Sequence, residues 1–270
     1  MNFKKIIIVC CLVAIGFVWQ AKSQPNKNCL LPKNIFSITA NANITQGLSI
    51  KHYGEPFFNT AITENFQGQF SYRRKLSPGM LASASIGLTT RNYYISYDFE
   101  APLTYPGLEH IDYHLNGFLF SSPVMPTFSL SVAKYFDRGP SKRRIVFPTL
   151  GRYFFVEAGV GISYEKEKKI YGGISLWYIS PNEEYVDFFS YDESVQSPFS
   201  AFSFAKVGLS YLTVRNNLLS LNLAVNYSPF PCRKATYRFY NLPYESYGDI
   251  SRYFNFVGLE LSYGFSFPRK

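Results

Sequence analysis

The feature of this 270-residue sequence that most restricts its fold is the alternation of apolar and polar residues along most of its length. In residues 36–45, every second residue is apolar and those between are Ser, Thr or Asn. Side chains of a β-strand alternate between two faces, so this period predicts strands with one apolar and one polar face. The pattern occurs ten times, in residues 36–45, 66–73, 82–89, 111–119, 128–133, 154–164, 170–179, 205–211, 219–227 and 257–267.

The composition of the polar faces favours a membrane barrel over a soluble sandwich. A soluble sheet turns its polar face to water and normally carries Lys, Glu and Arg there. Here only 17% of all residues are charged, and the polar faces are mostly Ser, Thr, Asn, Gln and Gly, which suits a narrow lumen. Aromatic residues at strand ends, such as Tyr153, Tyr227 and Phe265, fit two interfacial girdles. We therefore predict an all-β fold, a closed antiparallel transmembrane β-barrel of about ten strands, with eight as the alternative.

The connections between these strands alternate between short and long. The short ones are 76–79, 121–126, 165–169 and 213–217, and the long ones are 46–62, 96–108, 137–152, 181–198 and 229–250. Outer-membrane barrels have short periplasmic turns and long extracellular loops. The sequence therefore predicts that every long connection lies outside the cell.

The first residues read as an export signal. Lys4 and Lys5 precede the fourteen apolar residues 6–19, and Ala21 and Ser23 form a small-residue cleavage site. We expect a signal peptide over 1–23, a periplasmic N-terminal extension over 24–34 and the barrel domain over 35–270, with the mature chain starting at about Gln24. Cleavage would lower the net charge from +9 to +6, and export argues against a nucleic-acid partner.

Two cysteines remain after the predicted cleavage. Cys29 precedes the first strand, on the periplasmic side, and Cys232 lies in the last long loop, on the outer side. A disulfide needs Cα atoms within about 7 Å. We therefore predict that they do not pair with each other.

The last alternating segment, residues 254–267, resembles the final strand of small bacterial outer-membrane β-barrel proteins, the outer-membrane β-barrel domain family. The resemblance extends over 24–270 and includes the cleavage site and the rhythm of turns and loops. It implies a Gram-negative type outer membrane, contacts with membrane lipids and lipopolysaccharide, and periplasmic chaperones as partners. It also implies that the barrel-assembly machinery reads Phe267, although Pro268, Arg269 and Lys270 follow it. It carries no particular activity.

His110, Asp112 and His114 form the sharpest local pattern, because a spacing of two places them on one face of a strand. The histidines would be about 13 Å apart, too far to share one metal ion. We favour a polar ladder filling the lumen, with Tyr135 opposite Asp112, and predict no metal and no cofactor. The alternative is a lumen-mouth hydrolase of lipid or peptide that uses His114 and Asp112. That pair is similar to the Asp-x-His element of omptin-type proteases, whose facing Asp-x-Asp pair is not found here.

The charges assigned to the lumen are nearly balanced. They are Arg73, Arg91, Lys206, Asp112, Glu157, Glu165 and Glu260. Balanced charges in a narrow space favour internal pairing over an open pore, because even eight strands enclose a space that side chains can fill. A narrow gated channel for small solutes remains a further alternative.

The long connections are the other place for function. The third carries Arg138, Lys142, Arg143 and Arg144, which could meet lipid phosphates, and the fourth carries Glu183, Glu184 and Asp187 among aromatic residues, which could hold a cation or a sugar. We predict that these opposite charges draw the two loops together over the barrel mouth. The leading interpretation is a structural or surface-binding barrel with a largely closed lumen, and we favour a non-enzyme over an enzyme.

Overall fold

The computed structural model describes residues 30–45, 48–54, 58–61, 63–102, 112–121, 123–138, 149–166, 170–177, 185–242 and 244–266. Eight strands hydrogen-bond into a closed antiparallel barrel in the order β1-β16-β13-β12-β9-β8-β5-β4. They are β1 (Asn34–Thr45), β4 (Thr63–Ser77), β5 (Met80–Thr90), β8 (Val124–Asp137), β9 (Thr149–Tyr164), β12 (Phe199–Thr213), β13 (Leu218–Tyr227) and β16 (Phe256–Phe265). Within the described ranges, no helix is long and apolar enough to cross a membrane.

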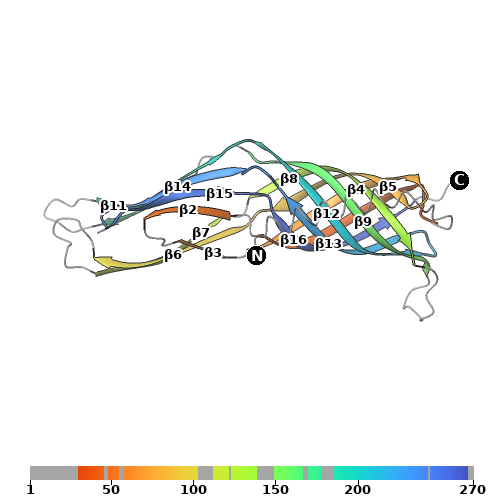
Figure 1. Cartoon of the computed structure of the whole chain (residues 1–270), viewed down its shortest axis with the longest axis horizontal. Coiled ribbons are helices and arrows are strands. Elements are labelled where there is room, and N and C mark those ends of the chain that lie inside the picture. Colours follow the sequence, from red (N-terminus) through yellow and green to blue (C-terminus); the bar gives the residue numbers. More distant parts are fainter. Residues whose placement is uncertain are drawn as a thin grey trace.

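Two further sheets extend from one end of the barrel (Figure 1). The five-stranded sheet has the order β10-β11-β14-β15-β2, and the three-stranded sheet has the order β3-β6-β7. Their strands are β2 (Leu48–Gly54), β3 (Phe58–Ala61), β6 (Tyr93–Pro102), β7 (Asp112–Ser121), β10 (Ile170–Trp177), β11 (Tyr185–Val195), β14 (Arg233–Phe239) and β15 (Ser246–Arg252). We call this end of the barrel the sheet end. The opposite end, where short turns join β4 to β5 and β12 to β13, is the turn end.

The predicted count of ten barrel strands is wrong, and the alternative of eight is correct. The runs at 111–119 and 170–179 do form strands, but these strands are β7 and β10, which lie in the sheets beyond the barrel. Alternation with a period of two indicates a strand whose two faces differ. A hairpin outside the barrel can also have two different faces, so the pattern does not distinguish it from a barrel strand.

Because β7 and β10 are not barrel strands, several connections lie at the end of the barrel opposite to the predicted one. β8 ends and β9 begins at the turn end. The prediction that the connection 137–152 is one of the long outer loops is therefore wrong. Conversely, β9 ends at Tyr164 at the sheet end, and the next strand, β10, belongs to the five-stranded sheet. The strands that flank the basic third loop, β8 and β9, meet it at the turn end, whereas β10 and β11, which flank the acidic fourth loop, belong to the five-stranded sheet beyond the sheet end. This removes the basis for the prediction that the two loops lean together over one mouth. Residues 142–144 and 183–184 themselves lie outside the described part of the chain.

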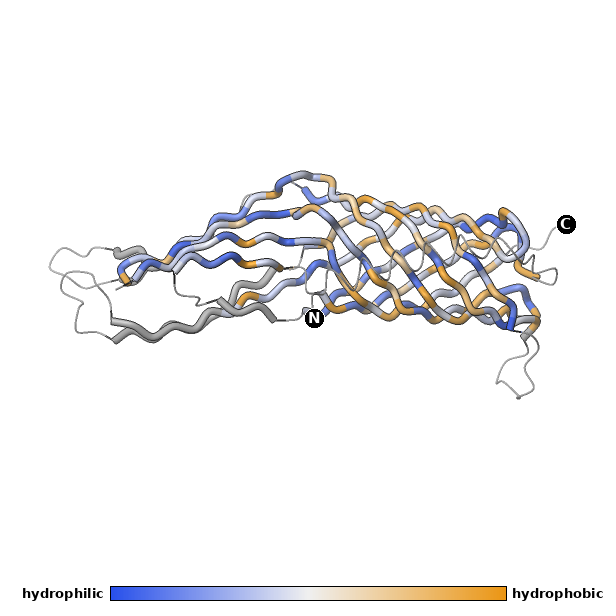
Figure 2. The backbone as a smooth tube through the Cα atoms, viewed as in Figure 1, coloured by the Kyte–Doolittle hydropathy of each residue, from blue (hydrophilic) through white to orange (hydrophobic). Residues whose placement is uncertain are grey.

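The apolar series of the barrel strands face outward, as predicted. Leu259 is 62% exposed, Phe66 60% and Ile86 60%, whereas Thr39 and Asn41 on the opposite face of β1 are each 3% exposed. Figure 2 shows this apolar belt around the barrel, with more polar chain beyond it. Large exposed apolar patches are rare on soluble proteins. The outward side chains of this belt are therefore expected to contact an apolar solvent, such as the interior of a lipid bilayer.

Aromatic side chains border the apolar belt. Phe36 packs on Tyr72 and Phe265 near the turn end, and Tyr164 packs on Phe199 near the sheet end. β9 runs between these two levels, and ten residues at about 3.3 Å each, tilted by about 40°, span about 25 Å along the barrel axis. This matches the apolar band of an outer-membrane barrel. Of the girdle residues expected, Tyr153 instead points into the lumen, where it is 1% exposed.

Side chains fill the lumen in layers. At the turn end lies an apolar plug, which consists of Leu31, Ile35, Leu81, Ala133, Tyr135, Tyr153, Phe155, Leu212 and Leu218. In the sheet-end half lies an aromatic layer, which consists of Met125, Phe202, Phe204, Ala224, Phe254 and Phe256. Gly159 and Gly161 of β9 make room for this layer, because the ring of Phe204 occupies the space of a side chain at 159 and that of Phe202 the space at 161.

Gly159→Ala is expected to lower the free energy of unfolding by about 1–3 kcal/mol, because the new methyl group meets the Phe204 ring and the Leu130 carbonyl oxygen. The matched control is Gly68→Ala, whose methyl group enters open space on the outer face of β4. Urea unfolding of both variants in the same detergent measures the difference. Equal stability of the two variants would show that the aromatic layer is loosely packed.

Candidate functional site

A buried ionic cluster lies where the barrel continues into the two sheets. We call it the rim cluster, and it consists of Arg91, Tyr93, Glu165, Tyr191, Glu193, Cys232, Arg233 and Arg252. These residues come from the ends of β5 and β9 and from β6, β11, β14 and β15 with the segment before β14. Each is at most 7% exposed. The cluster therefore joins elements from both outer sheets to the barrel wall.

Glu193 is the centre of the rim cluster and is 0% exposed. Its carboxylate lies 2.7 Å from Arg252 and 3.5 Å from Arg233. The hydroxyl groups of Tyr93 and Tyr191 donate to it at 3.3 and 3.2 Å. Arg233 also pairs with Glu165 at 2.6 Å. Three arginines and two glutamates thus share one buried site whose charges mostly neutralise each other.

The remaining members of the rim cluster pack around these ion pairs. The Arg252 guanidinium lies 3.0 Å from the centre of the Tyr93 ring, and Arg91 lies 4.7 Å from that of Phe254. Arg91 donates to the Cys232 sulfur at 2.8 Å, and burial raises the pKa of that thiol. Burial likewise raises the pKa of Tyr191. Both groups therefore stay protonated at neutral pH, and the arrangement is suited to holding strands together rather than to nucleophilic chemistry.

Deeper in the barrel, the predicted pairing of lumen charges is confirmed for Lys206 and Glu260, whereas Asp112 belongs to β7, outside the barrel. Lys206 lies 2.9 Å from Glu260, and Ser131 donates to Glu157 at 2.6 Å. Arg73 donates to Tyr135 at 3.2 Å. The lumen pocket beside Lys206 and Glu260 measures about 20 Å³, which is room for about one water molecule.

The eight strands form a closed ring, side chains fill the lumen, and the outer belt is apolar. This is the fold of a small transmembrane β-barrel, with a closed ring of antiparallel strands and an apolar outer band. Within this fold, many residues that line the lumen contact each other, as Lys206 and Glu260 do.

Comparisons with solved structures agree with this fold at low identity. The outer membrane protein OprG of Pseudomonas aeruginosa is 12% identical, with 88% of this chain and 98% of that chain covered and a TM-score of 0.41. AlkL, an outer membrane protein, is 14% identical, with 92% and 98% covered and a TM-score of 0.32. Neisserial surface protein A is 11% identical, with 85% and 94% covered and a TM-score of 0.30. No protein-family model and no curated protein matches the chain.

The fold assignment rests on the closed ring of strands and on the two faces of its wall.

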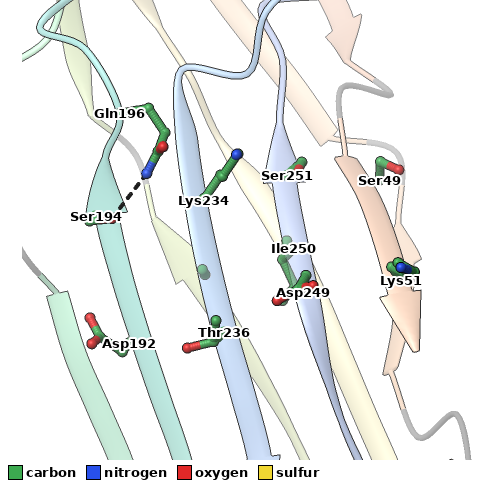
Figure 3. A pocket seen from close by; sticks show the side chains of 11 residues that line it. Ser49, Lys51, Asp192, Ser194, Gln196, Lys234, Thr236, Asp249, Ile250 and Ser251 are labelled. Carbon is green, nitrogen blue, oxygen red and sulfur yellow. Dashed lines mark hydrogen bonds between the residues drawn. The ribbon is translucent and has the colours of Figure 1, made fainter. Parts of the chain in front are cut away.

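The outward face of the five-stranded sheet carries a pocket of about 660 Å³ (Figure 3). We call this surface the polar face. Its side chains form rows across β2, β15, β14 and β11, because the register pairs Lys51 with Asp249, Asp249 with Thr236, and Thr236 with Asp192. The neighbouring row is Ser49, Ser251, Lys234 and Ser194. Two lysines and two aspartates balance, so the pocket offers hydrogen-bond donors and acceptors without net charge.

Aromatic rings border the polar face on one side. Tyr53 stacks on Tyr247 with 5.1 Å between ring centres, and Lys51 lies 4.7 Å from the Tyr53 ring. Arg238 approaches Tyr247 from the next strand, at 5.9 Å. The pKa of Lys51 is raised, chiefly by its hydrogen bond with Tyr53, so this lysine remains charged.

The structure does not bring the predicted catalytic residues to the lumen. Asp112 and His114 belong to β7, where they pair with Pro102 and Glu100 beyond the barrel, and His110 lies outside the described residues. Tyr135 contacts Arg73 in the barrel, so the predicted position opposite Asp112 is wrong. Within the described ranges, no three His, Cys, Asp or Glu side chains come together as a possible metal site.

Most predicted loop residues lie outside the described part of the chain. This holds for Lys142, Arg143, Arg144, Glu183 and Glu184, and also for Cys29 and Phe267. Arg138 lies at the turn end, where its backbone amide donates to the Arg152 carbonyl. Asp187 lies in β11 and pairs with Ser175. Cys232 carries a free thiol.

Sequence reasoning missed both the polar face and His52. The ring of His52 lies on the inner side of β2, with its Nδ1 atom 2.6 Å from the Tyr237 hydroxyl. Burial lowers the pKa of His52 and raises that of Tyr237 to about 12. The sequence does carry a signal, since residues 234–239 alternate like the barrel strands, although the prediction places them in one long loop.

Glu193→Gln is expected to lower stability by about 3 kcal/mol, because it leaves Arg252 and Arg233 buried without their shared negative charge. The matched control is the adjacent Asp192→Asn, which is exposed on the polar face and should change stability by less than about 0.5 kcal/mol. Thermal unfolding together with limited proteolysis of the outer sheets measures both effects. Similar losses in the two variants would contradict the central role of Glu193.

Proposed function

We propose that this protein is an outer-membrane barrel whose closed lumen anchors a surface-exposed binding unit, built from the five-stranded and three-stranded sheets. In this proposal the turn end faces the periplasm and the sheet end faces the outside of the cell. The apolar belt supports a membrane location, because its outward side chains need a hydrocarbon environment. The short turns at one end and the long hairpins at the other support the orientation.

The observation that carries the proposal is the closure of the lumen at three successive levels. The apolar plug fills the turn end, the Lys206–Glu260 pair crosses the middle, and the aromatic layer and rim cluster lie toward the sheet end. Eight strands enclose a space just wide enough for side chains. The lumen pocket beside Lys206 and Glu260 has room for about one water molecule, so we place the ligand site outside the lumen.

We further propose that the ligand of the polar face is an uncharged carbohydrate. Sugar hydroxyl groups both donate and accept hydrogen bonds, and the pocket presents Lys51 and Lys234 as donors and Asp192 and Asp249 as acceptors. The charges cancel, so the face favours neither a polyanion nor a polycation. The exposed ring of Tyr247, 38% accessible, offers an apolar surface on which a sugar ring can stack.

The hydrolase alternative lacks support, because β7 holds Asp112 and His114 away from the lumen mouth. A gated channel would require the apolar plug and the buried ion pairs of the lumen to move together. Breaking a buried ion pair costs several kcal/mol, which disfavours frequent opening.

The closed lumen predicts that purified protein in planar bilayers gives no steady current in neutral buffer. Proof of insertion comes from resistance of the barrel to protease in the same lipid, and a porin of sixteen or more strands serves as the conducting control. A large, steady conductance in protease-resistant preparations would contradict the closed lumen.

The carbohydrate proposal predicts binding to members of an array of neutral oligosaccharides. The double variant Lys51→Ala, Asp249→Ala is expected to weaken the strongest interactions about thirtyfold, because two hydrogen-bonding groups worth about 1 kcal/mol each are lost. The control is Lys166→Ala, Glu245→Ala, which removes one exposed charge of each sign outside the pocket. Binding that is absent, or that is weakened equally by both double variants, would count against the polar face as the site.

A further inference from the structure

The turn end of the barrel is strongly basic. The described residues there, 30–36, 72–82, 133–138, 149–155, 211–218 and 263–266, contain eight basic residues and one acidic residue, Asp137. Arg73 points into the lumen, where it contacts Tyr135. Lys33, Arg74, Arg138 and Arg215 are exposed. The polar face at the opposite end has balanced charges, so the two ends of the barrel differ in kind.

A pocket of about 380 Å³ lies within this basic end. It is lined by Arg138, Arg152, Tyr153, Leu209, Ser210 and Tyr211. Arg138 and Arg152 are held side by side, because the Arg138 amide donates to the Arg152 carbonyl at 2.9 Å. The pocket therefore combines two cationic side chains with aromatic and aliphatic ones.

Arg152 lies on the lipid-facing side of the wall. Tyr153 and Phe155 point into the apolar plug, so alternation along β9 turns Arg152 outward. It pairs across the sheet with Tyr211 of β12. Its Nε atom is buried and has no hydrogen-bond partner among the described residues. A buried guanidinium N–H without an acceptor is costly, which favours an acceptor that comes from outside the protein.

We propose that Arg138 and Arg152 bind the phosphate of a phospholipid headgroup from the membrane leaflet at the turn end. A guanidinium group matches phosphate in shape and charge, and two of them bind it more tightly than one. Leu209 and Tyr211 lie where the first acyl carbons would enter the apolar belt. The surrounding Lys33, Arg74 and Arg215 favour headgroups with net negative charge over zwitterionic ones. This inference rests on the proposed membrane location but not on the proposed carbohydrate site.

The test uses the full chain in nanodiscs of phosphatidylcholine alone and of phosphatidylcholine with an equal amount of phosphatidylglycerol. After release into detergent, native mass spectrometry counts the lipids retained. We expect about tenfold preference for phosphatidylglycerol and its loss in the double variant Arg138→Gln, Arg152→Gln. The control variant is Arg238→Gln, an exposed arginine at the sheet end, which should keep the preference.

Three outcomes would overturn the inference. Equal retention of the two lipids by the wild-type protein would exclude a headgroup site while leaving the membrane location intact. Loss of preference in Arg238→Gln as well would indicate a general charge effect. Displacement of the lipid by millimolar inorganic phosphate would identify a site for the free anion. Failure to insert into either bilayer would contradict the proposed membrane location itself, and this inference with it.

Discussion

Closure of an eight-stranded ring is the constraint on which the rest of this structure depends. The ring satisfies every strand edge within the hydrocarbon layer, and it leaves a lumen no wider than facing side chains can fill. Each polar group that faces inward must therefore find its partner inside, as Lys206 does with Glu260 and Ser131 with Glu157. Where β9 carries glycine, the rings of Phe202 and Phe204 occupy the vacant space. The barrel is consequently a packed core with its apolar side turned outward.

The sequence predicts this wall well because its two faces contrast so strongly. The alternation in residues 36–45 and 257–267 identifies both the strands and the side that meets lipid, and Ile38 and Leu259 are exposed accordingly. The same alternation cannot tell how far a strand lies from the membrane. Alternation alone therefore predicts β7 and β10 as barrel strands, and counting them in the barrel reverses the side of each connection between β7 and β10. Whether a strand belongs to the barrel or to an outer sheet depends on its pairing partners. These are set by contacts between segments far apart in the sequence.

The site was harder to predict for a related reason. The polar face takes its side chains from β2, β11, β14 and β15, which the sequence separates by up to two hundred residues. Each contributing strand has only a few polar residues of ordinary kinds, so no single segment carries a motif. By contrast His110, Asp112 and His114 stand out as a local pattern, but β7 holds Asp112 and His114 beyond the lumen. The predicted pairing of lumen charges succeeded because it depended only on confinement and not on the identity of the partners.

The rim cluster explains how an outer unit of two sheets can be held on a barrel whose lumen is closed. Its ion pairs join Glu165 at the end of β9 to Arg233 of β14, and Glu193 of β11 to Arg252 of β15. Buried ion pairs add little to stability compared with apolar packing, but they penalise any register in which a charge loses its partner. Sliding one hairpin of the five-stranded sheet by two residues would preserve its faces while leaving at least one of these charges alone. The rim cluster thus fixes the register of β11, β14 and β15, and the same register aligns Asp192, Thr236 and Asp249 into one row on the opposite face of the sheet.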